Sequence, residues 1–178
     1  MVVDFMRIGK KNKSSKGNKR LMQLYRFSPI QNKEQLLKAA EYIVTKTSEL
    51  CKKVIGQSLP ISSITIFSHY QDEFEQLKKI LLDLGKLHSD NNGPRVALHK
   101  PLNLGSNTVT HIRVRKPDPY RMQVGCNDFE VEDYIEFKKN YLPSHPDNLR
   151  LINRADYEMI EFFDPDYGVL AYVVSNKI

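Results

Sequence analysis

The sequence predicts an α+β fold in which two β-α-β-β-β modules form a curved mixed sheet around a cleft, preceded by a long N-terminal helix. Apolar residues recur at helical spacing over 32–56 and alternate with polar residues from 61 onward. A second strand and helix begin near 126, and the equivalent strand residues Ile64 and Phe129 lie 65 positions apart. The alternative is an α+β domain whose halves merely look alike.

The N-terminal segment carries the whole positive surplus of the chain. The protein has 178 residues, with 27 Lys and Arg against 21 Asp and Glu, for a net charge of +6. Segment 9–20, GKKNKSSKGNKR, holds six cations and no acid, so the rest of the chain is neutral and does not indicate a globally basic nucleic-acid-binding domain. Because this segment lacks apolar residues, we expect residues 1–20 to form a flexible basic arm and residues 21–178 to form a single domain.

The predicted elements follow each other in a regular order. The helix over 32–56 begins at Asn32, a favoured N-cap residue, with Gln35 at its third position, and ends at Gly56. Module one, 61–117, holds the strand in SSITIF, the helix QDEFEQLKKILLDLG with Gly85 as its stop, and strands near 86–89, 95–99 and 109–115. Module two, 124–178, repeats this with CNDFEVED, a helix in YIEFKKNYL, and strands near 148–153, 157–163 and 168–175.

Alternation sorts the strand side chains into apolar and polar rows. The apolar rows, which we expect to pack under the helices, comprise Ile64, Ile66, Val96, Leu98, Ile112, Val114, Phe129 and Val131. The polar rows comprise Ser63, Thr65, Phe67, Arg95, Ala97, His99, His111, Arg113, Arg115, Asp128 and Glu130. Such a polar face is either an ordinary solvated sheet surface or, where the sheet curves, the wall of a binding site.

Arginine and histidine gather on two strands of this polar face. Arg95, Arg113 and Arg115 present planar donor forks that match carboxylate or phosphate, which predicts an anionic small-molecule ligand. His99 and His111 are the candidate catalytic acid or base, because imidazole titrates near neutral pH. The predicted ligand-binding set also includes Thr65, Asp128 and Glu130.

Charge divides the neutral body into two halves. Residues 86–125 hold seven cations and two acids, a net of +5, whereas residues 126–167 hold eleven acids and four cations, a net of −7. The halves either pair with each other across the module boundary or form a dipolar cleft for a ligand with unlike ends. Both interpretations are open on the sequence alone.

The chain resembles the glyoxalase and extradiol-dioxygenase-like superfamily, also called vicinal oxygen chelate proteins. The resemblance lies in SSITIFSHYQDEFEQLKKILLDLGKL, GPRVALHKPL, THIRVRKPDP and GCNDFEVED, after the long helix, and spans roughly 33–174. Within the superfamily the chain is most similar to the YecM-like family of bacterial proteins. The resemblance implies a cleft lined by polar side chains, lyase-, isomerase- or oxygenase-like chemistry as an open question, and a homodimer as a common assembly.

The resemblance also indicates where metal ligands would lie. Superfamily enzymes place them near the start of the first strand and on the last strand of each module, which corresponds to Ser63, Asp128, Arg115 and Tyr172. Arginine repels a divalent cation and serine is a weak ligand, so a degenerate site with no favoured cofactor is expected, and Tyr172 joins the ligand-binding set. The alternative is a displaced divalent-metal site formed by His99, His111, Asp128 and Glu158.

The remaining sequence features concern the cellular location and the partners of the protein. Cys51 and Cys126 lack metal-binding or disulfide spacing, and no apolar run reaches the roughly 20 residues of a membrane span. MVVDFMRIGKK lacks a secretory signal pattern, so we expect a cytoplasmic protein without a membrane partner. The alternative function is a non-enzymatic interaction module whose 9–20 arm binds nucleic acid or an acidic partner weakly.

Overall fold

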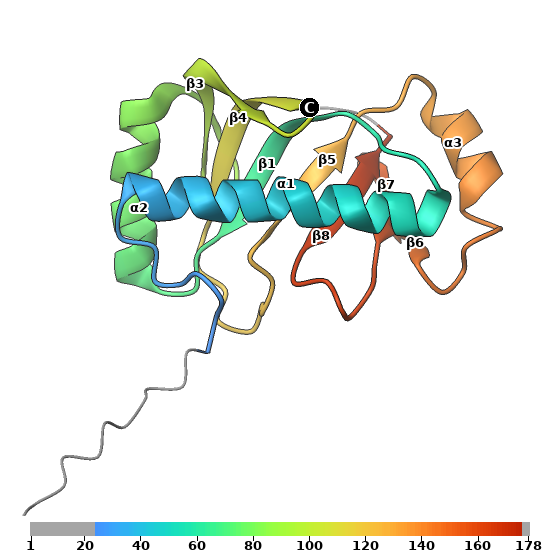
Figure 1. Cartoon of the computed structure of the whole chain (residues 1–178), viewed down its shortest axis with the longest axis horizontal. Coiled ribbons are helices and arrows are strands. Elements are labelled where there is room, and N and C mark those ends of the chain that lie inside the picture. Colours follow the sequence, from blue (N-terminus) through green and yellow to red (C-terminus); the bar gives the residue numbers. More distant parts are fainter. Residues whose placement is uncertain (1–23, 176–178) are drawn as a thin grey trace, which may run out of the picture.

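The computed structural model describes residues 24–175, so the arm predicted over 1–20 lies outside the described residues. Within them, eight strands form one sheet accompanied by three helices (Figure 1). The helices are α1 (Lys33–Ile55), α2 (Gln71–Leu84) and α3 (Tyr134–Tyr141). The strands are β1 (Ile61–Phe67), β2 (Gly85–Asp90), β3 (Pro94–Leu104), β4 (Asn107–Arg115), β5 (Gly125–Phe129), β6 (Leu149–Asn153), β7 (Glu158–Phe162) and β8 (Leu170–Val174).

The sheet repeats one topology in its two halves. Its strand order is β2-β3-β4-β1-β5-β8-β7-β6. The first strands of the two halves, β1 and β5, lie at the centre of the whole sheet. Each pairs in parallel with the fourth strand of its own half, β1 with β4 and β5 with β8. The two halves meet where β1 and β5 pair antiparallel. The predicted α+β class and the repeated β-α-β-β-β order are therefore confirmed.

Helix α1 covers the centre of the sheet, across the junction of the two halves (Figure 1). It begins as predicted, because the side chain of Asn32 accepts a hydrogen bond of 2.9 Å from the Gln35 N–H, and it ends at Gly56 in the left-handed region, with φ of 75°. At Gly125 a Cβ would lie 2.2 Å from the Thr65 carbonyl oxygen of β1 and 2.5 Å from Cδ1 of Ile43 in α1. Glycine is therefore required where the first strand of the second half pairs with β1 under this helix.

The apolar rows pack under the helices, as alternation predicted. The buried side chains of these rows include Ile64, Ile66, Val96, Ile112, Val114 and Phe129. Together with the inner face of α1, they form the core on one side of the sheet. Every polar residue on the alternate positions is thereby turned to the opposite side.

Helix α2 ends at Gly85 as predicted, but the structural reason differs from that of a left-handed cap. The φ of Gly85 is −166° and it is the first residue of β2, where a Cβ would lie 2.3 Å from the Ala97 carbonyl oxygen. Strand β3 continues to Leu104 instead of ending at His99, because it turns at Gly105, with φ of 60°, and pairs again with β4. A register shift between Ala97 and Leu102 hid this continuation from period-two analysis.

Candidate functional site

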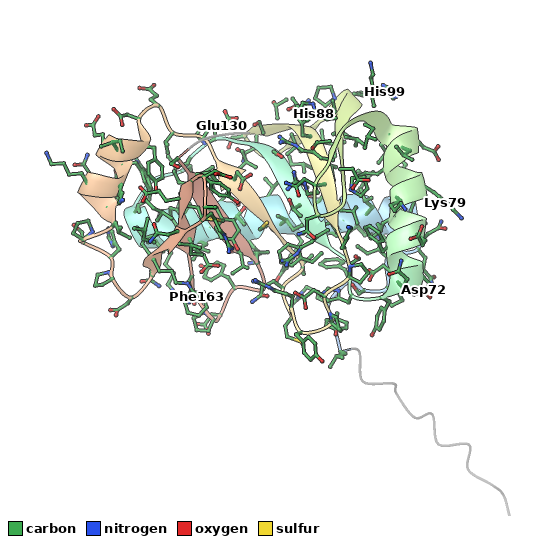
Figure 2. The ribbon with its side chains drawn as sticks, turned by 180° about the vertical axis from the view of Figure 1, so that it is seen from behind. Asp72, Lys79, His88, His99, Glu130 and Phe163 are labelled. Atoms are coloured by element: carbon green, nitrogen blue, oxygen red, sulfur yellow. The ribbon has the colours of Figure 1, made fainter. Side chains whose placement is uncertain are left out.

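The candidate site lies on the sheet face opposite α1. Figure 2 shows this face from the front, with α1 behind the sheet and no ribbon of a helix crossing it. Strand register places one row of side chains across it, in the order Lys86, Ala97, His111, Ser63, Asp128, Tyr172, Glu161 and Arg150. The next row comprises Ser89, Arg95, Arg113, Thr65, Cys126 and Leu170. We call this surface the open face.

Arg95 and Arg113 form the most unusual contact of the open face. They are direct cross-strand partners in the β3–β4 pair, so two like charges oppose each other. The Nε atom of each guanidinium is buried and has no hydrogen-bond partner. Burial lowers the pKa of Arg95, the neighbouring charge of Arg113 lowers it further, and Asp128 opposes this effect. Two strong donors are thus held desolvated and unpaired, which is costly unless a ligand accepts from them.

His111 lies one row away from the arginine pair. Its ring contacts the ring of His88 edge to face, with centroids 5.1 Å apart, and its Nδ1 lies 2.9 Å from the Thr110 hydroxyl oxygen. Burial lowers the pKa of His111, and the positive charge of Arg95 and the neighbouring His88 add to this effect. The imidazole is therefore neutral at neutral pH, as an acceptor of protons must be.

The other half of the open face carries an acidic network. The Tyr172 hydroxyl donates a hydrogen bond of 3.1 Å to Oε1 of Glu161, a carboxylate that is only 2% exposed. Arg150 donates to the other oxygen of Glu161 in an ion pair. Burial raises the pKa of Tyr172, so its hydroxyl stays protonated and engaged. Asp128 lies between Ser63 and Tyr172 and joins this network to the basic half.

Thr65 and Cys126 occupy the centre of the face, on the two strands where the halves meet. Burial raises the pKa of the Cys126 thiol to about 12, and the hydrogen bond with Thr65 offsets only part of this. The thiol is therefore uncharged and a poor nucleophile at neutral pH. Thr65 places its hydroxyl beside Arg113, its partner across the β1–β4 pair.

The other predicted residues differ in where they lie, and Arg115 belongs to the open face, one row beyond Arg113 and opposite Phe67. His99 is exposed in the middle of β3, within the register shift between Ala97 and Leu102, and Figure 2 shows it apart from the face. Arg115 lies over the Phe67 ring at 5.2 Å and forms an ion pair with Asp118 at 3.6 Å. Glu130 lies at the sheet end and accepts a hydrogen bond from the Ser62 hydroxyl. The structure thus gathers Arg95, Arg113, His111, Thr65, Asp128 and Tyr172 on one face and leaves His99 outside.

Sequence reasoning missed His88 and Glu161. A register shift between Leu87 and Ser89 interrupts the alternation of β2, so the position of His88 beside His111 has no period-two signal. Glu161 lies between two buried apolar residues, Ile160 and Phe162, in a short strand. Its alternation with them is the signal that assigns it to the polar face.

The residues at the expected metal positions do not fit a divalent cation. Among residues 24–175 no group of three or more His, Cys, Asp and Glu side chains has the arrangement of a metal site. Of the four aligned positions, Ser63 and Asp128 are cross-strand partners, but Arg115 is a cation and Tyr172 is bound to Glu161.

The displaced set also fails, because Glu158 lies on the helix side of the sheet. There its carboxylate forms an ion pair of 2.6 Å with Lys138 of α3. His111 and Asp128 lie on the opposite side, so the sheet separates them from Glu158. The four residues of the alternative displaced site, His99, His111, Asp128 and Glu158, therefore do not lie together on one side of the sheet.

Fold and site together define an α+β sheet with two repeated β-α-β-β-β halves and an arginine-containing open face. A solved structure titled "Structural Genomics, Protein EC4020" is similar to this chain with a TM-score of 0.61 and 14% identity, over 88% of this chain and 94% of that one. Methylmalonyl-CoA epimerase from Mycobacterium tuberculosis aligns with a TM-score of 0.33 and 14% identity, over 64% of this chain and 85% of that one. No protein-family model and no curated protein matches the sequence. At 14% identity, the first similarity shows a shared fold alone.

None of the helices among the described residues is long and apolar enough to cross a bilayer. Cys51 and Cys126 are both free thiols. Membership of the vicinal oxygen chelate superfamily, and of its YecM-like family, stays a prediction.

Proposed function

We propose that the protein binds an anionic small molecule on the open face through Arg95 and Arg113. The observation that carries this proposal is the pair of opposed guanidinium groups whose buried Nε atoms have no partner. Without a bound anion, an arginine pair of this kind lowers the stability of the fold through charge repulsion and missing hydrogen bonds. A bound anion removes both costs at once, and the planar donor fork of arginine suits carboxylate and phosphate oxygens.

The residues beside the arginine pair suggest how a ligand would be oriented on the open face. Thr65 adjoins Arg113 across the β1–β4 pair, and Asp128 is the next polar residue toward the acidic half. A ligand with its anionic end on the arginines would present its other end to Asp128 and Tyr172. We therefore propose a ligand with an anionic group and a hydroxyl or cationic group on its far side.

Titration calorimetry on the full chain tests this function. The probes are sulfate, acetate and phenyl phosphate, with neutral glycerol as the uncharged comparator. We expect at least one anion to bind, and Arg95→Gln and Arg113→Gln to abolish that binding. Arg154→Gln is the matched control, because Arg154 is exposed on the loop between β6 and β7. Absence of binding by every anion, or equal binding in the Arg113 variant, would overturn the proposal.

A second candidate function concerns the start of the chain. The described residues begin beside exposed apolar side chains: Leu24 is 57% exposed, Met122 is 53% exposed and Tyr120 is 94% exposed. Tyr25 joins these segments, because its hydroxyl donates a hydrogen bond of 2.7 Å to the Pro119 carbonyl. We propose that the 9–20 arm, with its six cations, binds nucleic acid weakly.

Fluorescence anisotropy with a labelled single-stranded oligonucleotide tests the role of the arm. The full chain should bind with an affinity that falls steeply as salt rises, and a chain that lacks residues 1–20 should not bind. A variant in which the six cations are replaced by glutamine is the length-matched control. Unchanged binding after deletion would exclude the arm as the contact. A homodimer, a cytoplasmic location, a lyase-, isomerase- or oxygenase-like activity and an acidic protein partner stay predictions.

A further inference from the structure

The arginine pair concentrates more positive charge than a single carboxylate neutralises. Arg95 and Arg113 oppose each other directly, and Lys86 follows on the neighbouring edge strand. Asp128 is the acid that acts on Arg95. Arg115 lies one row away and shares Asp118 with Arg121, so Asp118 offsets only part of the positive charge there. A doubly charged anion relieves this repulsion more completely than a singly charged one, because Coulomb energy scales with the product of the charges.

The arrangement of donors also favours a ligand with more than two acceptor oxygens. The two guanidinium groups approach from neighbouring strands, and each has a buried Nε that needs an acceptor. Thr65 and Ser63 follow on the next strand, opposite Arg113 and His111. A carboxylate has two oxygens and is satisfied by one arginine fork. A tetrahedral oxyanion has further oxygens for the second fork and for a hydroxyl.

His111 responds to the charge of whatever occupies this place. The charged and titratable groups that face it are His88 and Lys86 from β2, Arg95 from β3, Arg113 from its own strand and, beyond Ser63, Asp128 from β5. Most of these groups are cationic or become so, and together with burial they keep the imidazole neutral in the free protein. A dianion bound beside Arg95 places a net negative charge near the His111 ring, which favours the protonated imidazolium.

We propose that the open face takes a doubly charged tetrahedral oxyanion, of the class of the phosphate group of a phosphate monoester, and that His111 takes up a proton when this anion binds. The inference rests on the proposed function, since the same arginine pair holds the anion. The proton comes from solvent and adds to a ring nitrogen of His111, which converts imidazole to imidazolium. No bond of the ligand forms or breaks in this step.

Calorimetry in two buffers measures the proton directly. The full chain is titrated with sulfate in bis-Tris and in Tris at pH 7, because these two amine buffers differ in ionisation enthalpy, neither is an anion, and sulfate keeps both charges without titrating. We expect sulfate to bind about tenfold or more tightly than acetate, since it carries twice the charge. The two buffers should also report uptake of a fraction of one proton per sulfate. Phenyl phosphate is titrated at pH 8, where it is a dianion. If the site favours a phosphate monoester over an inorganic oxyanion, phenyl phosphate should bind more tightly than sulfate.

Two variants assign the proton to a residue. His111→Gln should abolish proton uptake, whereas His99→Gln, the matched control at an exposed position, should retain it. In the wild-type protein, sulfate affinity should fall by up to about tenfold per pH unit as pH rises through the pKa of His111 in the complex. A ring signal followed by NMR should titrate at higher pH with sulfate than without it. This last measurement does not depend on the folding of any variant.

The outcomes separate the inference from the proposed function. Sulfate binding without proton uptake, or acetate binding as tight as sulfate, would overturn the inference and leave anion binding intact. Loss of uptake in His88→Gln but not in His111→Gln would overturn the assignment to His111. Failure of sulfate, phenyl phosphate and acetate to bind would overturn both the inference and the proposed function.

Discussion

Glu73, at the beginning of α2, binds the segment before α1, because its Oε1 accepts a hydrogen bond of 2.8 Å from the backbone N–H of Ile30. The other carboxylate oxygen accepts from the backbone N–H of His69 at 2.8 Å. The side chain is only 2% exposed, and Ile30 is 1% exposed. One buried carboxylate thus satisfies one donor four residues away and another donor 43 residues away in sequence.

Glu73→Ala should therefore destabilise the fold strongly. The substitution leaves two buried backbone donors without an acceptor, and each such donor costs about 1–3 kcal/mol. We expect the free energy of unfolding in urea to fall by about 2–4 kcal/mol for this reason. Glu75→Ala, in an exposed ion pair with Lys78 on the same helix, should change it by less than about 1 kcal/mol. Equal effects of the two variants would contradict this role of Glu73.

His69 should make stability depend on pH. Its ring stacks on Tyr25 with centroids 3.8 Å apart, and its Nε2 lies 2.7 Å from the Arg121 carbonyl oxygen, so Nε2–H donates there in the neutral ring. Burial lowers the pKa of His69 below its ordinary value of 6.5. The unfolded chain consequently binds the proton first, so the contribution of His69 is complete above pH 6.5 and is lost as pH falls from there toward the folded-state pKa.

The slope of unfolding free energy against pH, between pH 5 and 7.5, checks this prediction. His69→Gln should give a shallower slope than the wild-type protein, and His99→Gln should keep the wild-type slope. His111 has a lowered pKa as well, so some slope should persist in the His69 variant. Identical slopes in His69→Gln and wild-type protein would show that this imidazole is not held neutral by the fold.

Arg113→Met should stabilise the protein in the absence of anions. Methionine keeps the length of the stem but removes the like charge opposite Arg95 and one buried unpaired donor. We expect the free energy of unfolding to rise by about 0.5–1 kcal/mol in low-salt buffer. Sulfate should then raise the melting temperature of the wild-type protein and not that of the variant. A less stable Arg113→Met protein under these conditions would mean that the opposed arginines are not strained.

Cys126 and Cys51 should react slowly with thiol reagents in the folded protein. Burial raises the pKa of Cys126 to about 12 and that of Cys51 to about 11. At pH 8 very little thiolate is present, and thiolate is the reactive form. Ellman's reagent should label both thiols promptly only in denaturant, while a cysteine introduced by Leu82→Cys, at a side chain that is 51% exposed, should react in the folded state. Prompt labelling of Cys126 without denaturant would contradict its assignment as an inert thiol.

Much of the fold followed from local patterns. The sequence predicted the N-cap of α1 at Asn32, the ends of α1 and α2, and the order of the strands along the chain. These features could be predicted because capping and apolar periodicity depend on residues a few positions apart. Ile64, Ile112 and Phe129 were assigned to the helix side by alternation alone. The errors arose where a register shift breaks alternation, as between Ala97 and Leu102.

By itself the sequence determined which face of each strand carries arginine and histidine, because side-chain alternation is a property of the extended backbone. Only the tertiary structure decided that Arg95 lies opposite Arg113, that His88 contacts His111 and that Glu158 lies on the far side of the sheet from Asp128. These relations depend on strand order and on register, which are set by long-range pairing and by bulges and leave no mark in residue spacing.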